Sequence, residues 1–253
     1  MTAAPTRTDT LLDGRLRLEQ PSGGHRAGTD AVLLAAAAPQ GFAGEAVDLG
    51  SGVGTVGLAL AVTEPAARVL LVEKDETAAA LAARNADANG VTDRVRVLSA
   101  DVLAPAAARH AAGLRPGKAA LVLTNPPFDT AGTVRATPDP ARRAAHVLQP
   151  GDLDRWMRCA LDVLAPHGAL VCIHRAVALP ELLATLGGRF GAIAVRPVLP
   201  RDGAAATRVL VRAIKGSRAP FSLLAPLVLH APDGAFTPAA EAIHRGRERL
   251  DWA

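Results

Sequence analysis

The sequence has few aromatic residues and almost no cysteine. Its 253 residues include no tyrosine, two tryptophans, five phenylalanines and two cysteines, Cys159 and Cys172. Two cysteines cannot form a disulfide framework or a four-ligand zinc site, and the histidines occur singly without a pattern typical of metal ligands, so we expect no metal centre. With so few aromatic side chains, any platform that stacks nucleobases must be small.

Long apolar runs are also missing. No run approaches the roughly 20 residues needed to span a bilayer, and residues 1–13 are polar and carry both signs of charge, unlike a secretory signal. Hydrophobic residues make up 49% and charged residues 21% of the chain, which excludes disordered, collagen-like and coiled-coil proteins. The sequence therefore predicts a globular protein of the cytoplasm with no membrane contact.

Lysine is scarce, although the chain is basic. The formal net charge is +4, and 25 of the 28 basic residues are arginine. Arginine forks match the geometry of phosphate groups, which would suit a phosphate-bearing partner. A genome rich in G and C would give the same bias, so composition alone leaves both explanations open.

Short β-branched apolar runs alternate with longer alanine- and leucine-rich helical patterns, which is typical of parallel βαβ units. We expect a single domain over residues 1–253, with an arm and a first helix in 1–40 and a core with a C-terminal tail in 41–253. The arm is expected to be loose, with one short strand at 16–18. Thr29 and the residue after it are of the type that caps a helix.

The C-terminal half follows a different pattern. The strands expected at 192–198 and 207–214 are joined by a link too short for a helix, which predicts that they are antiparallel neighbours. A strand at 223–230 and a helix at 237–249 complete the expected tail. The longest expected loop lies between Phe128 and Pro150.

A glycine-rich turn follows the first core strand and begins a helix. Its sequence, Asp48-Leu-Gly50-Ser-Gly52-Val-Gly54, lets the backbone turn sharply and approach a ligand closely. Residues 52–57 also match the dinucleotide fingerprint G-x-G-x-x-G. An NAD-dependent oxidoreductase is therefore one interpretation of this turn.

Two acidic residues, Asp48 and Asp101, favour S-adenosylmethionine as the ligand, and a third, Glu73, is compatible with either cofactor. Asp48 suits a ligand with an ammonium group and would repel a pyrophosphate, whereas Glu73, at the end of the second strand, could bind the ribose of either cofactor. Asp101, after the third strand, could accept a hydrogen bond from an adenine amino group. A helix N-cap is the alternative role for Asp101.

The fourth strand ends at Asn125-Pro126-Pro127-Phe128, where open α/β sheets bind their ligands. The Asn125 side-chain oxygen and the Pro126 carbonyl could accept hydrogen bonds from a planar NH2 group and return electron density to its nitrogen. Two prolines hold these acceptors in place, and Phe128 could stack on a flat base. A rigid turn is the structural alternative.

In this order, these motifs resemble those of class I amino-methyltransferases, and Gly28-Thr29-Asp30 with the tail at 231–233 is similar to the bacterial tRNA1(Val) adenine-37 N6-methyltransferase family. The resemblance covers roughly residues 16–250. It implies an α/β, Rossmann-like class I methyltransferase fold, with a seven-stranded, mostly parallel sheet, one antiparallel strand, and helices on both faces. It also implies S-adenosylmethionine as cofactor and methyl transfer to N6 of an adenine in RNA, at A37 of a tRNA anticodon loop.

The resemblance assigns a role to each motif residue. The glycines would line the methionine part of the cofactor, with Asp48 on its ammonium, Glu73 on the ribose and Asp101 on the adenine. Thr29 and Asp30 would close over the methionine end. The target amine would be held by Asn125 and Pro126, with Pro127 fixing the backbone and Phe128 stacking in place of the tyrosine common in the family. The residues meant here are Thr29, Asp30, Asp48, Gly50, Gly52, Gly54, Glu73, Asp101, Asn125, Pro126, Pro127 and Phe128.

Basic residues in the long loop could contact the nucleic acid. Arg142, Arg143 and His146 follow the Asn-Pro-Pro-Phe motif, and a solvated helical face is the alternative interpretation. A protein glutamine N5-methyltransferase, or an rRNA or DNA adenine methyltransferase, would use the same acceptor motif. The 47 residues before Asp48 are few for the helical domain that glutamine methyltransferases carry there. The particular RNA, the position in it and the oligomeric state stay open at this point.

Overall fold

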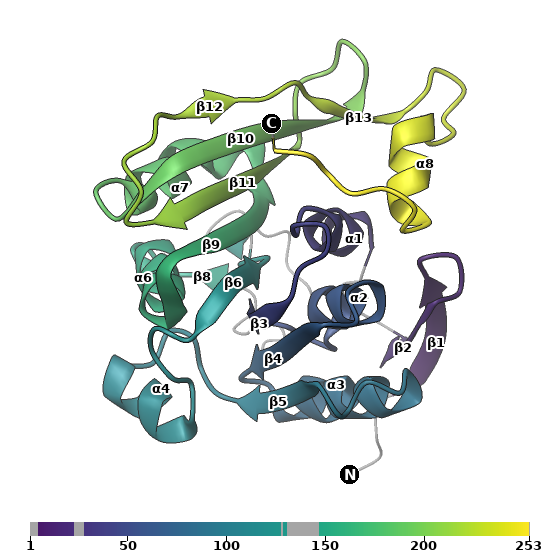
Figure 1. Cartoon of the computed structure of the whole chain (residues 1–253). Coiled ribbons are helices and arrows are strands. Elements are labelled where there is room, and N and C mark those ends of the chain that lie inside the picture. The colour runs from purple at the N-terminus through teal and green to yellow at the C-terminus, as the bar shows by residue number, and fades with distance from the viewer. Residues whose placement is uncertain (1–4, 23–27, 128, 131–146, 253) are drawn as a thin grey trace.

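The structure is a computed structural model, and it describes residues 5–22, 28–127, 129, 130 and 147–252. The expected alternation of strands and helices is present along the chain (Figure 1). The strands are β1 (Thr6–Leu11), β2 (Leu16–Pro21), β3 (Gly44–Leu49), β4 (Ala67–Glu73), β5 (Val95–Ser99), β6 (Ala119–Thr124), β7 (Asp129–Thr130), β8 (Val147–Leu148), β9 (Leu164–Arg175), β10 (Phe190–Arg201), β11 (Arg208–Lys215), β12 (Ser222–Leu223) and β13 (Leu227–His230). The helices are α1 (Thr29–Ala36), α2 (Thr55–Thr63), α3 (Glu76–Ala88), α4 (Ala106–Ala112), α6 (Asp152–Val163), the single 3-10 turn η1 (Ala176–Ala178), α7 (Leu179–Leu186) and α8 (Pro238–His244).

Within the described residues the main sheet has nine strands in the order β12-β10-β11-β9-β6-β3-β4-β5, with β13 also paired to β10. Strands β3 to β6 and β9 are mutually parallel, and β11 is antiparallel to both β9 and β10. The seven neighbouring strands β10-β11-β9-β6-β3-β4-β5 confirm the expected methyltransferase sheet with one antiparallel strand, β11. The sheet is wider than expected because β12 and β13 also pair with β10. These two short strands replace the single strand predicted at 223–230, which is interrupted at residues 224–226.

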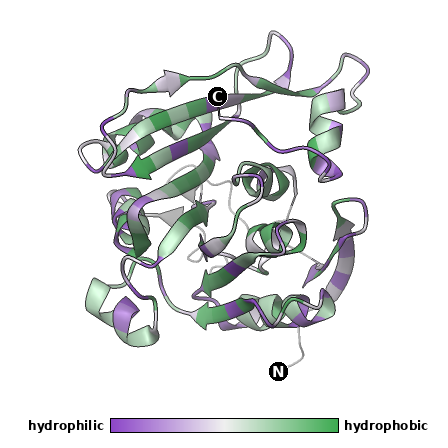
Figure 2. Ribbon diagram, in the orientation of Figure 1, coloured by the Kyte–Doolittle hydropathy of each residue, from purple (hydrophilic) through white to green (hydrophobic). Residues whose placement is uncertain are grey.

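Helices cover both faces of the sheet, as expected. One buried cluster unites residues of α1, α2 and α8 with one face of the strands, and a second unites α6 and α7 with the other face. The strands supply both clusters because successive side chains point to opposite faces: Ala46 belongs to the first cluster and Val47 to the second. Figure 2 shows the hydrophobic residues concentrated along these strands and inner helices.

The segment expected to be a loose arm is an antiparallel hairpin of β1 and β2. Leu16 and Leu18 are fully buried. Asn85 of α3 fixes the hairpin, because its Oδ1 accepts from the Glu19 backbone N–H at 2.7 Å and its Nδ2 donates to the Glu19 carbonyl at 3.0 Å. The local pattern missed β1 because alternating Thr, Arg and Asp side chains give it no hydrophobic face.

Two helix boundaries also differ from the prediction. Gly28 is the N-cap of α1, so Thr29 and Asp30 lie in its first turn and do not cap it. Helix α8 has Thr237 as its N-cap but ends at His244, and Gly246 then turns with φ +63°. The expected helix to residue 249 is therefore too long.

Candidate active site

The parallel strands bring the motif residues to one edge of the sheet. Leu49 at the end of β3 pairs with Thr124 of β6 and with Val72 of β4, and Glu73 pairs with Ser99 of β5. The glycine turn, Glu73, the Asp101 loop and the Asn-Pro-Pro motif therefore follow neighbouring strand ends. Open α/β sheets bind ligands at this edge.

The glycine turn is held to the end of β4 by its own amide groups. The N–H groups of Gly50 and Ser51 donate to the Val72 carbonyl at 2.9 and 3.0 Å, and Gly52 N–H donates to Oε2 of Glu73 at 2.8 Å. In a dinucleotide site, N–H groups of such a turn face a pyrophosphate. Here they are already bonded to protein oxygens, one of them anionic, which disfavours the NAD interpretation.

The glycines of this turn differ in what surrounds them. A Cβ on Gly50 would lie 2.8 Å from the Trp156 ring, and one on Gly54 would lie 2.9 Å from Leu71. A Cβ on Gly52 would meet no atom within 4 Å, although its φ of +56° still favours glycine. Gly50 and Gly54 are thus required for packing, and Gly52 is the glycine with open space beside it.

Asp48 is buried at the end of β3, with 2% of its surface exposed. Its Oδ2 accepts a 2.9 Å hydrogen bond from Gly57 N–H in the first turns of α2. Burial raises the pKa of Asp48 to about 7, the Gly57 hydrogen bond lowers it in part, and the negative charge of Glu73 adds to the rise. A carboxyl group whose charge is disfavoured in this way would be stabilised in its charged form by a nearby cation.

Glu73 links two loops of the site. One oxygen accepts from Gly52 N–H and the other accepts from Asp75 N–H at 2.9 Å. A carboxylate oxygen has further lone pairs, so the expected bonds to ribose hydroxyls are compatible with both contacts. Asp101 is exposed, and its Oδ1 accepts from Leu103 N–H at 2.9 Å in a turn. Pro105 is the N-cap of α4, so the alternative cap role of Asp101 is wrong.

Asn125 follows β6 with one polar atom unsatisfied. Its Oδ1 is buried and, among the residues that the structure describes, has no hydrogen-bond partner. Pro126 is buried and Pro127 is half-buried. A buried acceptor without a donor costs about 1–3 kcal/mol, so Asn125 has an oxygen that an incoming N–H group would satisfy.

A side chain that the sequence analysis missed joins the glycine turn to this acceptor. Trp156 of α6 is 6% exposed, and its indole Nε1–H donates to Thr124 Oγ1 at 2.9 Å. The Thr124 hydroxyl in turn donates to the Leu49 carbonyl at 2.9 Å. The ring that packs on Gly50 therefore also fixes the residue before Asn125. Only a tryptophan in an amphipathic helix signals this contact in the sequence.

Thr29 and Asp30 are bound to the C-terminal part of the chain. Arg208 Nε donates to Asp30 Oδ2 at 2.9 Å. His244 donates from Nδ1 to the Ala240 carbonyl at 2.7 Å, which leaves Nε2 to accept from the Thr29 hydroxyl at 3.2 Å. Their expected closure over the methionine end stays a prediction, and both residues have structural partners that the sequence pattern did not reveal.

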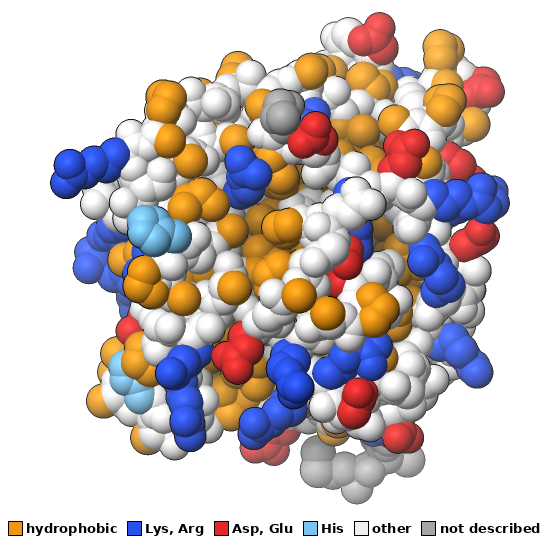
Figure 3. All heavy atoms as spheres, viewed as in Figure 1, with side chains coloured by type: hydrophobic (Ala, Val, Ile, Leu, Met, Phe, Trp, Pro, Cys, Tyr) orange, Lys and Arg blue, Asp and Glu red, His pale blue; other side chains and the backbone are white. Residues whose placement is uncertain are grey.

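Four predicted site residues lie outside the described residues, namely Phe128, Arg142, Arg143 and His146. On the molecular face in Figure 3, Lys and Arg side chains are interspersed with Asp and Glu around an apolar centre, so the net charge of +4 does not form one basic patch there. In the part of the chain that the structure describes, no three His, Cys, Asp or Glu residues cluster as metal ligands. No described helix combines the length and apolarity required to cross a membrane.

Comparison with known proteins identifies the family. The family described as Methyltransferase small domain matches residues 26–194. A tRNA1(Val) (adenine(37)-N6)-methyltransferase of Aeromonas hydrophila is 32% identical over 216 residues, which cover 84% of this chain and 85% of that protein. A protein of the same name from Porphyromonas gingivalis is 33% identical over 66% of this chain and 65% of its own length.

A solved structure agrees in fold. The crystal structure of a predicted O-methyltransferase from Agrobacterium tumefaciens has a TM-score of 0.75 and 34% identity, and the match covers 87% of this chain and 98% of that one. Together with the sheet order, these matches confirm the class I methyltransferase fold and the enzyme class. The chain belongs to the methyltransferase small-domain family and, within it, to the family of the bacterial tRNA1(Val) (adenine(37)-N6)-methyltransferases.

Proposed function

We propose that this enzyme transfers a methyl group from S-adenosylmethionine to the exocyclic N6 of adenine 37 in the anticodon loop of a tRNA. The observation that carries the proposal is the unsatisfied Oδ1 of Asn125, buried at the end of β6 and fixed beside the glycine turn through Thr124 and Trp156. The names of the relatives from Aeromonas and Porphyromonas support the substrate. A tRNA substrate would place the enzyme in the cytoplasm.

The residues at the turn fit the cofactor. S-adenosylmethionine supplies an electrophilic methyl group on a positively charged sulfur, and it also carries an ammonium group. The ammonium group would favour the charged form of Asp48, which burial and the negative charge of Glu73 oppose in the protein alone. Gly52 leaves open space for close approach. Asp101, an exposed acceptor on the neighbouring loop, would bind the adenine amino group.

Asn125 and Pro126 would act on the target amine by orienting it. Acceptance of hydrogen bonds from the NH2 group favours a pyramidal nitrogen whose lone pair points at the methyl carbon. The N–C bond forms as the S–C bond breaks, and the methylated nitrogen then loses a proton to water, so no protein base is required. Alignment of this kind can contribute about 7–11 kcal/mol to lowering the barrier.

Methyl transfer from labelled S-adenosylmethionine to total tRNA from a strain deleted for this gene tests the proposal. We expect N6-methyladenosine with the wild-type enzyme. Asn125→Ala should lower kcat by about 100-fold or more, in line with the loss of one preorganised polar contact, and should keep its affinity for the cofactor and its thermal stability.

The position of the label separates the alternatives. Label in rRNA, DNA or a protein amide, but not in tRNA, would refute the tRNA substrate and keep the chemistry. Label on a ribose or other hydroxyl would favour the O-methylation named for the Agrobacterium protein. An Asn125→Ala variant with wild-type kcat would refute the role of Asn125.

A further inference from the structure

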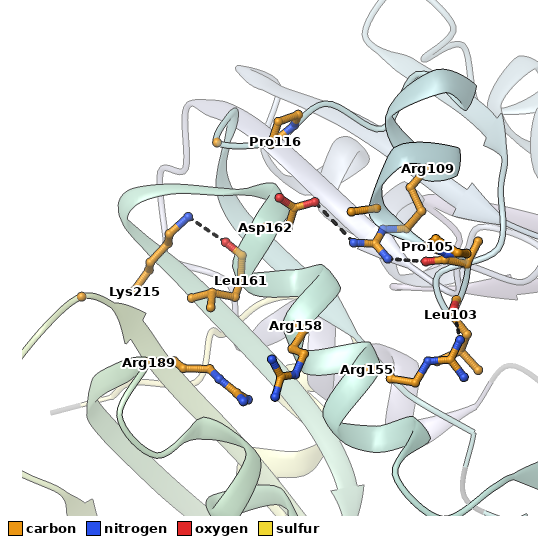
Figure 4. Close-up of a pocket in the computed structure, with 14 residues that line it drawn as sticks. Leu103, Pro105, Arg109, Pro116, Arg155, Arg158, Leu161, Asp162, Arg189 and Lys215 are labelled. Carbon is orange, nitrogen blue, oxygen red and sulfur yellow. Dashed lines mark hydrogen bonds and ion pairs between the residues drawn. The ribbon is translucent and has the colours of Figure 1, made fainter.

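A groove of about 1020 Å³ lies beside the candidate active site and not in it. Helix α6 forms one wall, α4 with the loop before it a second, and the turn before β10 with the end of β11 a third (Figure 4). The groove, here called the α6 groove, is lined by five basic side chains from four elements: Arg109, Arg155, Arg158, Arg189 and Lys215. The side chains that line it include no aromatic ring among the described residues.

The groove has more positive than negative charge. Four of its five cations, all arginines, contact carboxylates, namely those of Asp152, Asp154 and Asp162. Lys215 bonds no carboxylate among the described residues, and its Nζ donates to the Leu161 and Leu164 carbonyls at 2.7 and 2.6 Å. The excess charge is shared along the groove and is not concentrated at one point, which suits a chain of anions better than a single small anion.

Two of the arginines are both exposed and held in position. The Arg158 side chain is 61% exposed, and its Nε donates to Asp154 at 2.6 Å. The Arg155 side chain is 56% exposed, and one terminal nitrogen donates to Asp152 at 3.0 Å. A guanidinium has five N–H donors, so Arg158 keeps its terminal nitrogens for a ligand. A fork already fixed by a carboxylate loses little entropy when it binds phosphate.

One end of the groove is linked to the Asp101 loop of the candidate active site by hydrogen bonds. Arg155 donates to the Leu103 carbonyl, and Leu103 N–H donates to Asp101, the predicted adenine ligand. The residue after Arg155 is Trp156, which packs on the glycine turn. From this end the groove follows α6, whose 12 residues extend about 18 Å.

We propose that the α6 groove binds the sugar–phosphate backbone of the RNA on one side of the methylated adenine, an inference that rests on the proposed function. Guanidinium forks match phosphate geometry, and the absence of aromatic side chains from the described lining leaves no platform for base stacking. The contacts therefore position the RNA and do not read its sequence. This prediction concerns residues of α6 and its neighbours and is separate from the one that the sequence makes for Arg142, Arg143 and His146.

Arg158→Ala tests the groove, with Arg84→Ala as the matched control. Arg84 also lies on a helix, is 56% exposed and makes a single ion pair, with Glu19, but it belongs to α3 and is absent from the groove lining. The affinity for an unmodified tRNA transcript is measured across a range of salt concentrations. We expect Arg158→Ala to raise the Kd severalfold and to reduce the salt slope by about 1, with Arg84→Ala close to wild type. Arg158→Lys keeps the charge but not the fork, so it should keep the salt slope and raise the Kd less than Arg158→Ala.

Kinetics separate the groove from the catalytic site. Arg158→Ala should raise KM for tRNA while kcat and the affinity for S-adenosylmethionine stay at the wild-type level. If wild-type enzyme methylates tRNA but Arg158→Ala keeps the wild-type slope and KM, the groove proposal is refuted and the function stands. Wild-type enzyme that neither binds nor methylates tRNA refutes the proposed function itself. An unchanged slope with a changed oligomeric mass would make the groove an interface between copies, and would also overturn the proposal.

Discussion

We expect Asp48→Asn, which replaces the buried carboxyl group by an amide, to make the folded protein more stable and to weaken its binding of S-adenosylmethionine. The folded-state pKa of Asp48 is raised to about 7, chiefly by burial, whereas the unfolded chain has the ordinary carboxyl pKa. A raised carboxyl pKa means that the unfolded state loses its proton first, so folding stability falls as pH rises from about 4 to 7. The asparagine side chain does not titrate in this pH range, so the variant lacks this loss of stability.

The size of the effect follows from the two pKa values. The full shift corresponds to about 4 kcal/mol, and about 2–3 kcal/mol of it is expressed between pH 5 and pH 8. The buried Asn NH2 group can lack the hydrogen bond that it makes to water in the unfolded chain, at a cost of about 1–3 kcal/mol. That cost does not depend on pH. We therefore expect the free energy of unfolding of Asp48→Asn, relative to wild type, to improve by about 2–3 kcal/mol from pH 5 to pH 8.

Urea denaturation of both proteins at pH 5 and pH 8 measures this difference. Asp93→Asn is the control, because the Asp93 side chain is 74% exposed and its replacement should show no such trend. A difference between Asp48→Asn and wild type that is the same at both pH values would refute the reasoning from burial. In calorimetry at pH 8, the variant should bind S-adenosylmethionine more weakly. Unchanged affinity would remove Asp48 from the predicted cofactor contacts without touching the stability argument.

Three further predictions concern the packing of two glycines, the role of Trp156 and stability in acid. Gly57→Ala should destabilise the fold by about 1–3 kcal/mol, because its Cβ would collide with the Leu71 side chain. Gly52→Ala should cost about 1–2 kcal/mol for its left-handed φ and should mainly weaken cofactor binding. Thermal melting and calorimetry distinguish the two variants, and the reverse pattern would contradict these assignments. Trp156→Phe should lower stability by about 1–3 kcal/mol, since the Thr124 hydroxyl loses its donor and the smaller ring leaves a gap at Gly50. The variant should also have a lower kcat. A wild-type kcat would show that the indole does not position the Asn125 motif. Burial lowers the pKa of His174 to about 4, so the folded state resists protonation and stability should fall by about 3 kcal/mol as pH drops from 6.5 to 4. His174→Gln should lack this fall when both proteins are compared by urea denaturation. An equal fall in both proteins would exclude His174 as its cause.

The sequence by itself determined the features that depend on local pattern. Apolar runs alternating with helical patterns predicted the parallel sheet, because strand and helix periods are properties of short segments. The short link before β11 predicted that this strand is antiparallel to β10. The glycine turn and Asn125-Pro126-Pro127 were recognisable for a similar reason: their chemistry requires particular residue types close together in the chain. Both lie at strand ends, so a parallel topology was enough to predict that they share one edge of the sheet.

Only the tertiary structure decided which partners these residues have. Trp156 lies 32 residues after Thr124, and Arg208 lies 178 residues after Asp30; no local pattern encodes such pairs. The hairpin of β1 and β2 is ordered by its contacts with α3, and the α6 groove exists because four separate elements direct arginine and lysine side chains to one place. Periodicity specifies which face of an element is buried, whereas packing in three dimensions determines which distant side chains meet there.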